Sequence, residues 1–129
     1  MTAKPTSAAR RVLRVNGRKV RRDYKGEFIG QLDLVGLPIP AAEVTFAPPR
    51  RWRFDWAYQD HRIAIEYQGG NYTGVVGGHK TIKGLRNDYE KFTEAALRGW
   101  MLILIDSESV RDGRALAWVE RALRARLKT

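Results

Sequence analysis

Two acidic residues, Asp55 and Glu66, lie in stretches whose patterns do not call for a carboxylate. Asp55 stands among the aromatic residues of WRFDWAY (52–58), and Glu66 follows the apolar residues of IAIEY (63–67). Carboxylates are rarely fully buried unless they are paired or bind a metal. The two acids are therefore the first candidates for a functional site.

The stretches that carry these acids alternate like two β-strands, over 52–58 and 62–68. In the first strand the alternation places the aromatic residues on one face and Asp55 on the other. In the second strand it places Glu66 and Gln68 on one face. The aromatic residues Trp52, Phe54, Trp56 and Tyr58 are expected to be core residues rather than a platform for stacking bases.

The short connection between these strands predicts an antiparallel hairpin. A two-residue turn at 60–61 or a four-residue turn at 59–62 places Asp55 directly opposite Glu66. We expect the four-residue turn, because two-residue hairpin turns usually require glycine. A three-residue turn would instead put the two acids on opposite faces of the sheet.

Opposed residues in a hairpin have Cβ atoms about 4.5–5.5 Å apart, and two carboxylates that close repel unless a cation lies between them. No lysine in either strand is placed to compensate them. Carboxylate oxygens, with further positions open to water and phosphate, suit Mg²⁺, with Mn²⁺ as its expected substitute. The sequence therefore predicts a magnesium site at Asp55 and Glu66.

The alternative is an exposed sheet face on which Asp55 and Glu66 pair with Arg53 and Arg62. Against it, EYQGG lets the backbone turn immediately after the strand, which leaves the strand end open to a large ligand. A magnesium pair beside a basic segment favours phosphodiester chemistry.

The chain is strongly basic, with 24 Lys and Arg against 14 Asp and Glu and a formal net charge of +10. A small domain with this charge usually binds a polyanion, and we expect nucleic acid. The alternative is a solvated tail and helix face that serve only solubility. The predicted nucleic-acid-binding residues are Arg10, Arg11, Arg14, Arg18, Lys19, Arg21, Arg22, Lys80 and Lys83.

The 129 residues suit one domain, residues 23–129, preceded by a flexible basic arm, residues 1–22. We predict a helix from Tyr24 to Gly36, a short strand at 42–47, the hairpin, a glycine-rich loop, a helix at 85–98, a strand at 100–106 and a last helix. The fold class is α/β, an α+β mixed sheet with helices on both sides. The 100–106 strand is apolar enough to be central and covered on both faces.

The two later helices are predicted to be amphipathic. The apolar residues assigned to their inner faces are Leu85, Tyr89, Phe92 and Ala96 in the first, and Leu116, Val119, Leu123 and Leu127 in the second.

The chain has no cysteine, which excludes disulfides and thiolate metal sites. It has no apolar run long enough to span a bilayer, so we expect a cytoplasmic protein without a membrane partner. GVVGGHKT (74–81) departs from a phosphate-binding P-loop because His79 occupies the glycine position before the lysine.

Taken together, the segments GEFIGQLDLVGLP, WRFDWAY, IAIEYQGG, GGHK and RNDYEKFTEAALRGWMLILI resemble the PD-(D/E)XK nuclease superfamily. They are similar to small phage and bacterial endonuclease domains related to very-short-patch-repair enzymes. The resemblance covers residues 25–118. One position departs from the pattern, since Gln68 stands where the superfamily usually has a lysine.

This resemblance implies a restriction-endonuclease-like core of helix, three strands, helix and strand, and a Mg²⁺-dependent endodeoxyribonuclease. It implies that Lys91, on the following helix, replaces the missing lysine; the alternative is a solvated Lys91 paired with Asp88 or Glu94. It also implies that Glu27 is an accessory acid and that His79 contacts the scissile phosphate. Either residue is otherwise an ordinary surface residue.

The implied mechanism has Asp55 and Glu66 hold the metal together with the Gln68 side chain or the Tyr67 carbonyl. Lys91 then positions the attacking water and offsets negative charge, and the products carry a 5′-phosphate and a 3′-hydroxyl.

The substrate is left open between branched junctions, which would need a homodimer, and duplex DNA that is nicked or cut. Two alternatives from other classes also stay open. They are a non-catalytic nucleic-acid-binding module that lost its lysine at Gln68, and a basic protein-interaction domain.

Overall fold

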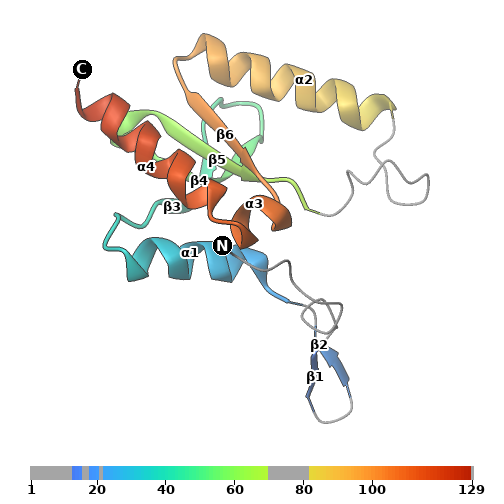
Figure 1. The fold of residues 1–129 in the computed structure, drawn as a ribbon. Helices are drawn as coiled ribbons and strands as arrows, with labels where there is room; N and C mark the ends of the chain where they lie inside the picture. Colours follow the sequence, from blue (N-terminus) through green and yellow to red (C-terminus); the bar gives the residue numbers. More distant parts are fainter. Residues whose placement is uncertain (1–12, 16–17, 21, 70–81, 129) are drawn as a thin grey trace.

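The computed structural model describes residues 13–15, 18–20, 22–69 and 82–128. From the first helix onward the elements confirm the predicted order of helix, three strands, helix, strand and helix, with one short helix added before the last. They are α1 (Tyr24–Leu34), β3 (Ala41–Thr45), β4 (Arg53–Tyr58), β5 (Ile63–Tyr67), α2 (Ile82–Leu97), β6 (Met101–Ile105), α3 (Ser107–Arg111) and α4 (Arg114–Leu127) (Figure 1).

The four strands form one mixed sheet in the order β3-β4-β5-β6. The first three are antiparallel, and β6 runs parallel to β5 after the crossover through α2. Residues of α1, α3 and α4 pack on one face, around Phe28, Ile65 and Val119. Ala95 of α2 packs on the other face with Phe54. The predicted α+β mixed sheet with helices on both sides is therefore confirmed.

Helix α1 begins where its sequence provides a cap. The Asp23 side chain accepts a hydrogen bond from the Gly26 N–H at 3.0 Å, which satisfies one of the unpaired amide groups of the first turn. Phe28 and Leu32, one turn apart, are fully buried against the sheet. The cap and these two side chains fix the first turn of α1 beside the sheet.

The prediction that the 100–106 strand is central was wrong. Strand β6 pairs only with β5 among the described strands and so forms an edge of the sheet, and Leu104 is 45% exposed. Ile103 and Ile105 are nonetheless buried, because helices pack over this edge. The apolar run therefore predicted neither the exposure of Leu104 nor the unpaired edge of the strand.

The prediction that the aromatic residues of β4 share one face was also wrong. Phe54 stacks on Phe46 on the α2 side, at 4.0 Å between ring centroids. Trp56 instead contacts Phe28 of α1 on the opposite side, at 5.2 Å. The change of face coincides with Glu43, which lies between the paired positions of β3 and has a left-handed φ of 54°. Such a residue interrupts the regular pleat.

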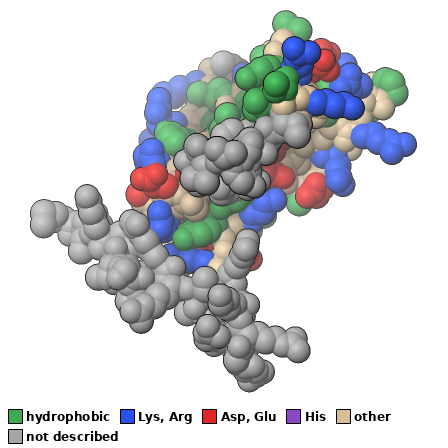
Figure 2. All heavy atoms as spheres, turned by 90° about the vertical axis from the view of Figure 1, so that its right-hand side faces the viewer, with side chains coloured by type: hydrophobic (Ala, Val, Ile, Leu, Met, Phe, Trp, Pro, Cys, Tyr) green, Lys and Arg blue, Asp and Glu red, His purple; other side chains and the backbone are tan. Residues whose placement is uncertain are grey.

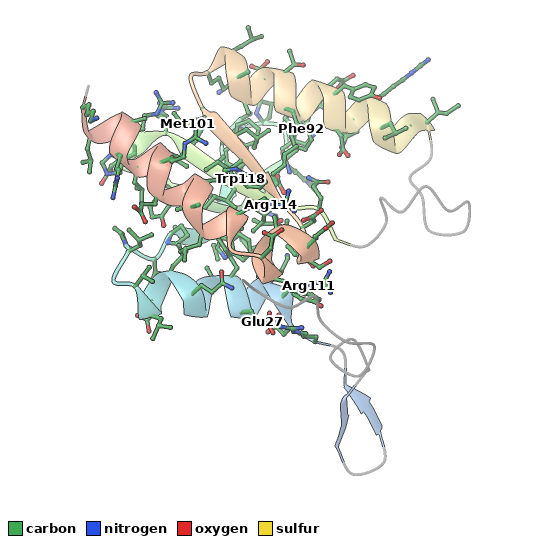
Figure 3. All side chains as sticks on the ribbon, viewed as in Figure 1. Glu27, Phe92, Met101, Arg111, Arg114 and Trp118 are labelled. Atoms are coloured by element: carbon green, nitrogen blue, oxygen red, sulfur yellow. The ribbon has the colours of Figure 1, made fainter. Side chains whose placement is uncertain are left out.

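The predicted inner face of α2 was wrong in part. Tyr89 is 64% exposed and Ala96 is exposed, whereas Ala95 is fully buried. Lys91 occupies an inward position, so the apolar stripe alone did not reveal which side of the helix meets the sheet. Figure 3 shows Phe92 pointing from α2 toward the sheet.

The stripe predicted for the last helix holds at Val119 and Leu123, which are buried, but Leu127 is exposed. Helix α3 was not predicted. Its beginning is marked by a capping box, in which Asp106 and Ser109 each accept a hydrogen bond from the other's backbone N–H.

Residues 1–22 were predicted to be a flexible basic arm. Within them, β1 (Leu13–Val15) and β2 (Arg18–Val20) form an antiparallel pair that is separate from the main sheet (Figure 1). Among the described helices, none has the length and apolar character that crossing a membrane would require.

Candidate functional site

The hairpin of β4 and β5 has the register predicted from its turn. The strands are joined by the four residues 59–62, and Trp56 lies opposite Ile65. The paired positions of β4 and β5 end there, one residue before the acids, and the side chains of Asp55 and Glu66 lie close enough to interact with each other. The four-residue turn is therefore confirmed, and the two acids come together at the end of β5 that points to the right in Figure 1.

Asp55 is held by contacts from two sides. Its Oδ2 accepts a hydrogen bond from the Tyr67 N–H at 2.7 Å, and its Oδ1 lies 3.5 Å from the Lys25 Nζ of α1. The first contact fixes the carboxyl at the end of the β5 strand. The second leaves Oδ1 facing a flexible, exposed lysine that another cation or a ligand can displace.

Glu66 is the most deeply buried acid of the site. Its side chain is 8% exposed, and it accepts a hydrogen bond from Lys91 of α2, whose own side chain is 14% exposed. Burial raises the pKa of Glu66 to about 7, because it disfavours the charged form; Lys91 acts to lower this pKa, and the nearby Asp55 raises it. The carboxyl thus changes charge near neutral pH.

The two acids do not pair with the arginines that the alternative interpretation proposed. Arg53 lies 3.7 Å from Glu43, and the Arg62 guanidinium lies over the Trp100 ring at 5.2 Å. The strands carry no lysine that compensates the acids, as predicted, and two helices each supply one, Lys25 from α1 and Lys91 from α2. Two carboxylates face two ammonium groups, so the four formal charges cancel when all are ionised.

Sequence reasoning missed Lys25. It lies in the first turn of the predicted helix, among other basic residues near the N-terminus. Its Nζ also lies 5.7 Å from the centre of the Trp56 ring, where a cation is weakly attracted by the aromatic face. The clue in the sequence is its position in the first turn of the helix, two residues after the Asp23 cap.

Lys91 is brought to the acid pair as the resemblance implied. The alternative pairing with Glu94 is not observed, because Glu94 accepts a hydrogen bond from Arg98 at 3.0 Å. The Lys91 Nζ also lies 5.8 Å from the centre of the Phe92 ring. Since Lys91 is mostly buried and held by Glu66, its ammonium group has a defined place.

Glu27 and Gln68 are not joined to the acid pair by any contact among the described residues. Glu27 lies near the start of α1 (Figure 3) and forms an ion pair with Arg22 at 2.6 Å. Gln68 follows the end of β5, and its N–H donates to the Ile105 carbonyl at 2.6 Å. Its side chain lines a small hollow with Asp106 and Trp118. Neither residue therefore contacts the acids as a third ligand would.

The other predicted site residues are only partly described. His79 and Lys80, with Arg10, Arg11 and Arg21, lie outside the described residues. Arg14, Arg18 and Lys19 belong to β1 and β2, where only the backbone is described. Lys83 is exposed on the first turn of α2.

The two carboxylates of the site suit a hard divalent cation. Most of the ligands of such a cation would come from solvent or substrate. Within the described part of the chain, no three His, Cys, Asp or Glu side chains gather closely enough to hold a metal. Mg²⁺, however, is usually bound by one or two carboxylates with water and phosphate oxygens completing its shell. Asp55 and Glu66 fit that pattern, and Figure 2 shows acidic side chains among Lys and Arg at this end of the molecule.

Comparison with known proteins identifies a similar fold and no family. No family model matches the sequence, and no curated protein does. The structure is similar to the catalytic domain of the homing endonuclease I-Bth0305I, with a TM-score of 0.51 and 15% sequence identity over 80% of this chain and 92% of that domain. At this identity the likeness concerns the fold alone, and the chain has a nuclease-like α/β fold.

Proposed function

We propose that the protein is a metal-dependent DNA endonuclease of the PD-(D/E)XK type. The observation that carries the proposal is the buried pair of Glu66 and Lys91 beside Asp55, at the end of β5. Burial of Glu66, which raises its pKa to about 7, lowers the stability of the fold when the carboxyl is charged. Acids with such perturbed pKa values are typical of functional sites. The similarity in fold to a homing endonuclease domain supports the same class of reaction.

Asp55 and Glu66 would hold Mg²⁺, with the Tyr67 carbonyl as a further ligand expected from the resemblance. A bound Mg²⁺ polarises phosphate oxygens and lowers the pKa of a coordinated water. The Tyr67 N–H keeps Asp55 oriented at 2.7 Å, so this carboxylate need not reorganise when the metal arrives.

Lys91 replaces the lysine that is missing at Gln68. Its ammonium group reaches Glu66 from α2, which places a positive charge beside the acid pair without a lysine on the strand. In this site it would orient the attacking water and stabilise negative charge that develops on the phosphate. Gln68, in contrast, has no contact with the acids among the described residues, and we assign it no catalytic role.

The substrate we propose is DNA, because the chain carries a net charge of +10 and the acid pair is bordered by lysines from two helices. A basic N-terminal arm would add sequence-independent affinity for phosphates. Cutting both strands of a branched junction would further require a homodimer with two such sites.

One observation favours a second candidate function. Lys25 and Lys91 already neutralise both acids, so the site is also consistent with a non-catalytic nucleic-acid-binding module whose ion pairs are structural. The two functions differ in whether a divalent cation displaces these lysines from the carboxylates.

Incubating supercoiled plasmid with the protein in Mg²⁺, Mn²⁺ or EDTA distinguishes them. The endonuclease converts plasmid to nicked or linear DNA with either metal and does nothing in EDTA. A gel shift without cleavage in any buffer would support the binding module. If the protein neither shifts nor cuts DNA, it is better explained as a protein-interaction domain.

A further inference from the structure

A second feature lies between the β3–β4 connection and the first turns of α2. It is a hollow, here called the α2 hollow, lined by Arg50, Ile82, Lys83, Arg86, Asn87 and Glu90.

The α2 hollow carries a net positive charge. Arg50 forms an ion pair with Glu90 at 3.2 Å, so these two charges offset each other. Lys83 and Arg86 are both exposed, and neither has a carboxylate partner among the described residues. Lys83 and Arg86 are three residues apart and so lie on neighbouring positions of the helix surface. Two such cations attract anionic groups rather than an apolar ligand.

The walls of the hollow are fixed to each other before any ligand binds. The Trp52 indole N–H donates to the Asn87 side-chain oxygen at 3.1 Å, which ties the start of β4 to α2. The Arg50 guanidinium lies over the same indole, 3.8 Å from the ring centre. The two cations of α2 are therefore presented by a braced helix, which lowers the ordering cost of binding.

The hollow and the acid pair are both bordered by α2. Asn87 lines it and lies four residues before Lys91, which contacts Glu66. Residues four apart on a helix share one face and are separated by about one turn, roughly 6 Å along the axis. A strand whose phosphate lies at the acid pair would therefore pass the hollow within its next few nucleotides.

We propose that the α2 hollow binds the backbone phosphates of duplex DNA on one side of the cleaved bond. The inference depends on the proposed function for the choice of DNA, and it adds Arg86 as a phosphate-binding residue alongside Lys83. Arg50 and Trp52 brace the surface. Phosphate contacts of this kind set affinity and position and carry no base sequence preference.

The test compares two double variants with the same change in charge. K83Q/R86Q removes the cations of the hollow, and R121Q/K128Q removes two exposed cations, one on α4 and one at its C-terminal cap, that do not line the hollow. Fluorescence anisotropy with a labelled duplex, in EDTA and at several salt concentrations, measures affinity for each. Circular dichroism confirms that both variants are folded.

For K83Q/R86Q we expect the slope of log affinity against log salt to become less steep by about two units, one for each lost phosphate contact. R121Q/K128Q should keep the wild-type slope. Equal slopes for both variants would overturn the proposal, and so would wild-type protein that binds vesicles of anionic lipid but no duplex.

The plasmid assay separates this inference from the proposed function. A wild-type protein that binds duplex through the hollow but never cuts would contradict only the endonuclease. A wild-type protein that cuts, with a K83Q/R86Q variant whose salt slope is unchanged, would contradict only the hollow.

Discussion

Replacing Lys91 by Met is predicted to affect stability differently at low and high pH. In the wild type the Glu66 carboxyl has a pKa of about 7 when folded, raised from an ordinary value of 4.5. A raised pKa means that the folded protein binds the proton more tightly than the unfolded chain does. This contribution to stability is fully present below about pH 4.5 and is lost as the pH rises through about 7.

The Lys91→Met variant loses the group that holds this pKa down. Its Glu66 pKa should therefore rise above 7, and the variant should lose about 1.4 kcal/mol relative to wild type for each pH unit between 7 and the new pKa. At about pH 8.5 the expected loss is about 2 kcal/mol. At about pH 5 Glu66 is protonated in both proteins, so Met, which needs no partner in this mostly buried position, should cost little or nothing.

Urea unfolding in EDTA at both pH values measures this difference. Lys83→Met is the matched control, because it makes the same change on the exposed first turn of the same helix and should have no pH-dependent effect. Combining Lys91→Met with Glu66→Gln should remove the part of the pH-dependent stability that comes from Glu66. A loss of stability that is equal at both pH values would refute the proposed coupling between Glu66 and Lys91.

Three further predictions test other parts of the structure. Lys25→Met should change the free energy of unfolding in urea by less than about 1 kcal/mol, since exposed ion pairs contribute little; a clearly larger loss would contradict the description of Lys25 as a displaceable partner of Asp55. Removing residues 1–22 should weaken DNA binding and flatten its salt dependence without changing the metal requirement, and an unaltered slope would mean that the arm does not contact DNA. Arg62 ends the β4–β5 turn with a φ of 54°, so Arg62→Gly should leave stability within about 0.5 kcal/mol while Arg62→Val costs about 1–2 kcal/mol. Equal unfolding free energies for the two Arg62 variants would contradict this account of the turn.

The register of the β4–β5 hairpin was predictable because strand alternation and turn length are local properties. Together they placed Asp55 opposite Glu66 without any knowledge of the rest of the fold. The position of Lys91 followed from resemblance to a family, since no spacing in the sequence links α2 to β5. Lys91 also sits on the side of α2 that an apolar stripe would have reserved for the core.

The parts that could not be predicted depend on contacts between distant segments. Lys25 reaches Asp55 only because α1 packs across the sheet, and its sequence position shows a helix start and nothing more. The shift of Phe54 to the α2 side coincides with the left-handed backbone of Glu43 on the neighbouring strand. No pattern within residues 52–58 contains that information.

The most direct test of the central claim is the single-turnover rate of plasmid cleavage by Asp55→Asn in Mg²⁺, with duplex affinity in EDTA measured alongside. Asn keeps the shape of the side chain and can still accept the hydrogen bond from the Tyr67 N–H, but it removes the charge that a divalent cation needs. We predict that the variant binds DNA at least as tightly as wild type and does not cut it. Cleavage at a rate near that of the wild type would show that Asp55 and Glu66 are not the metal site.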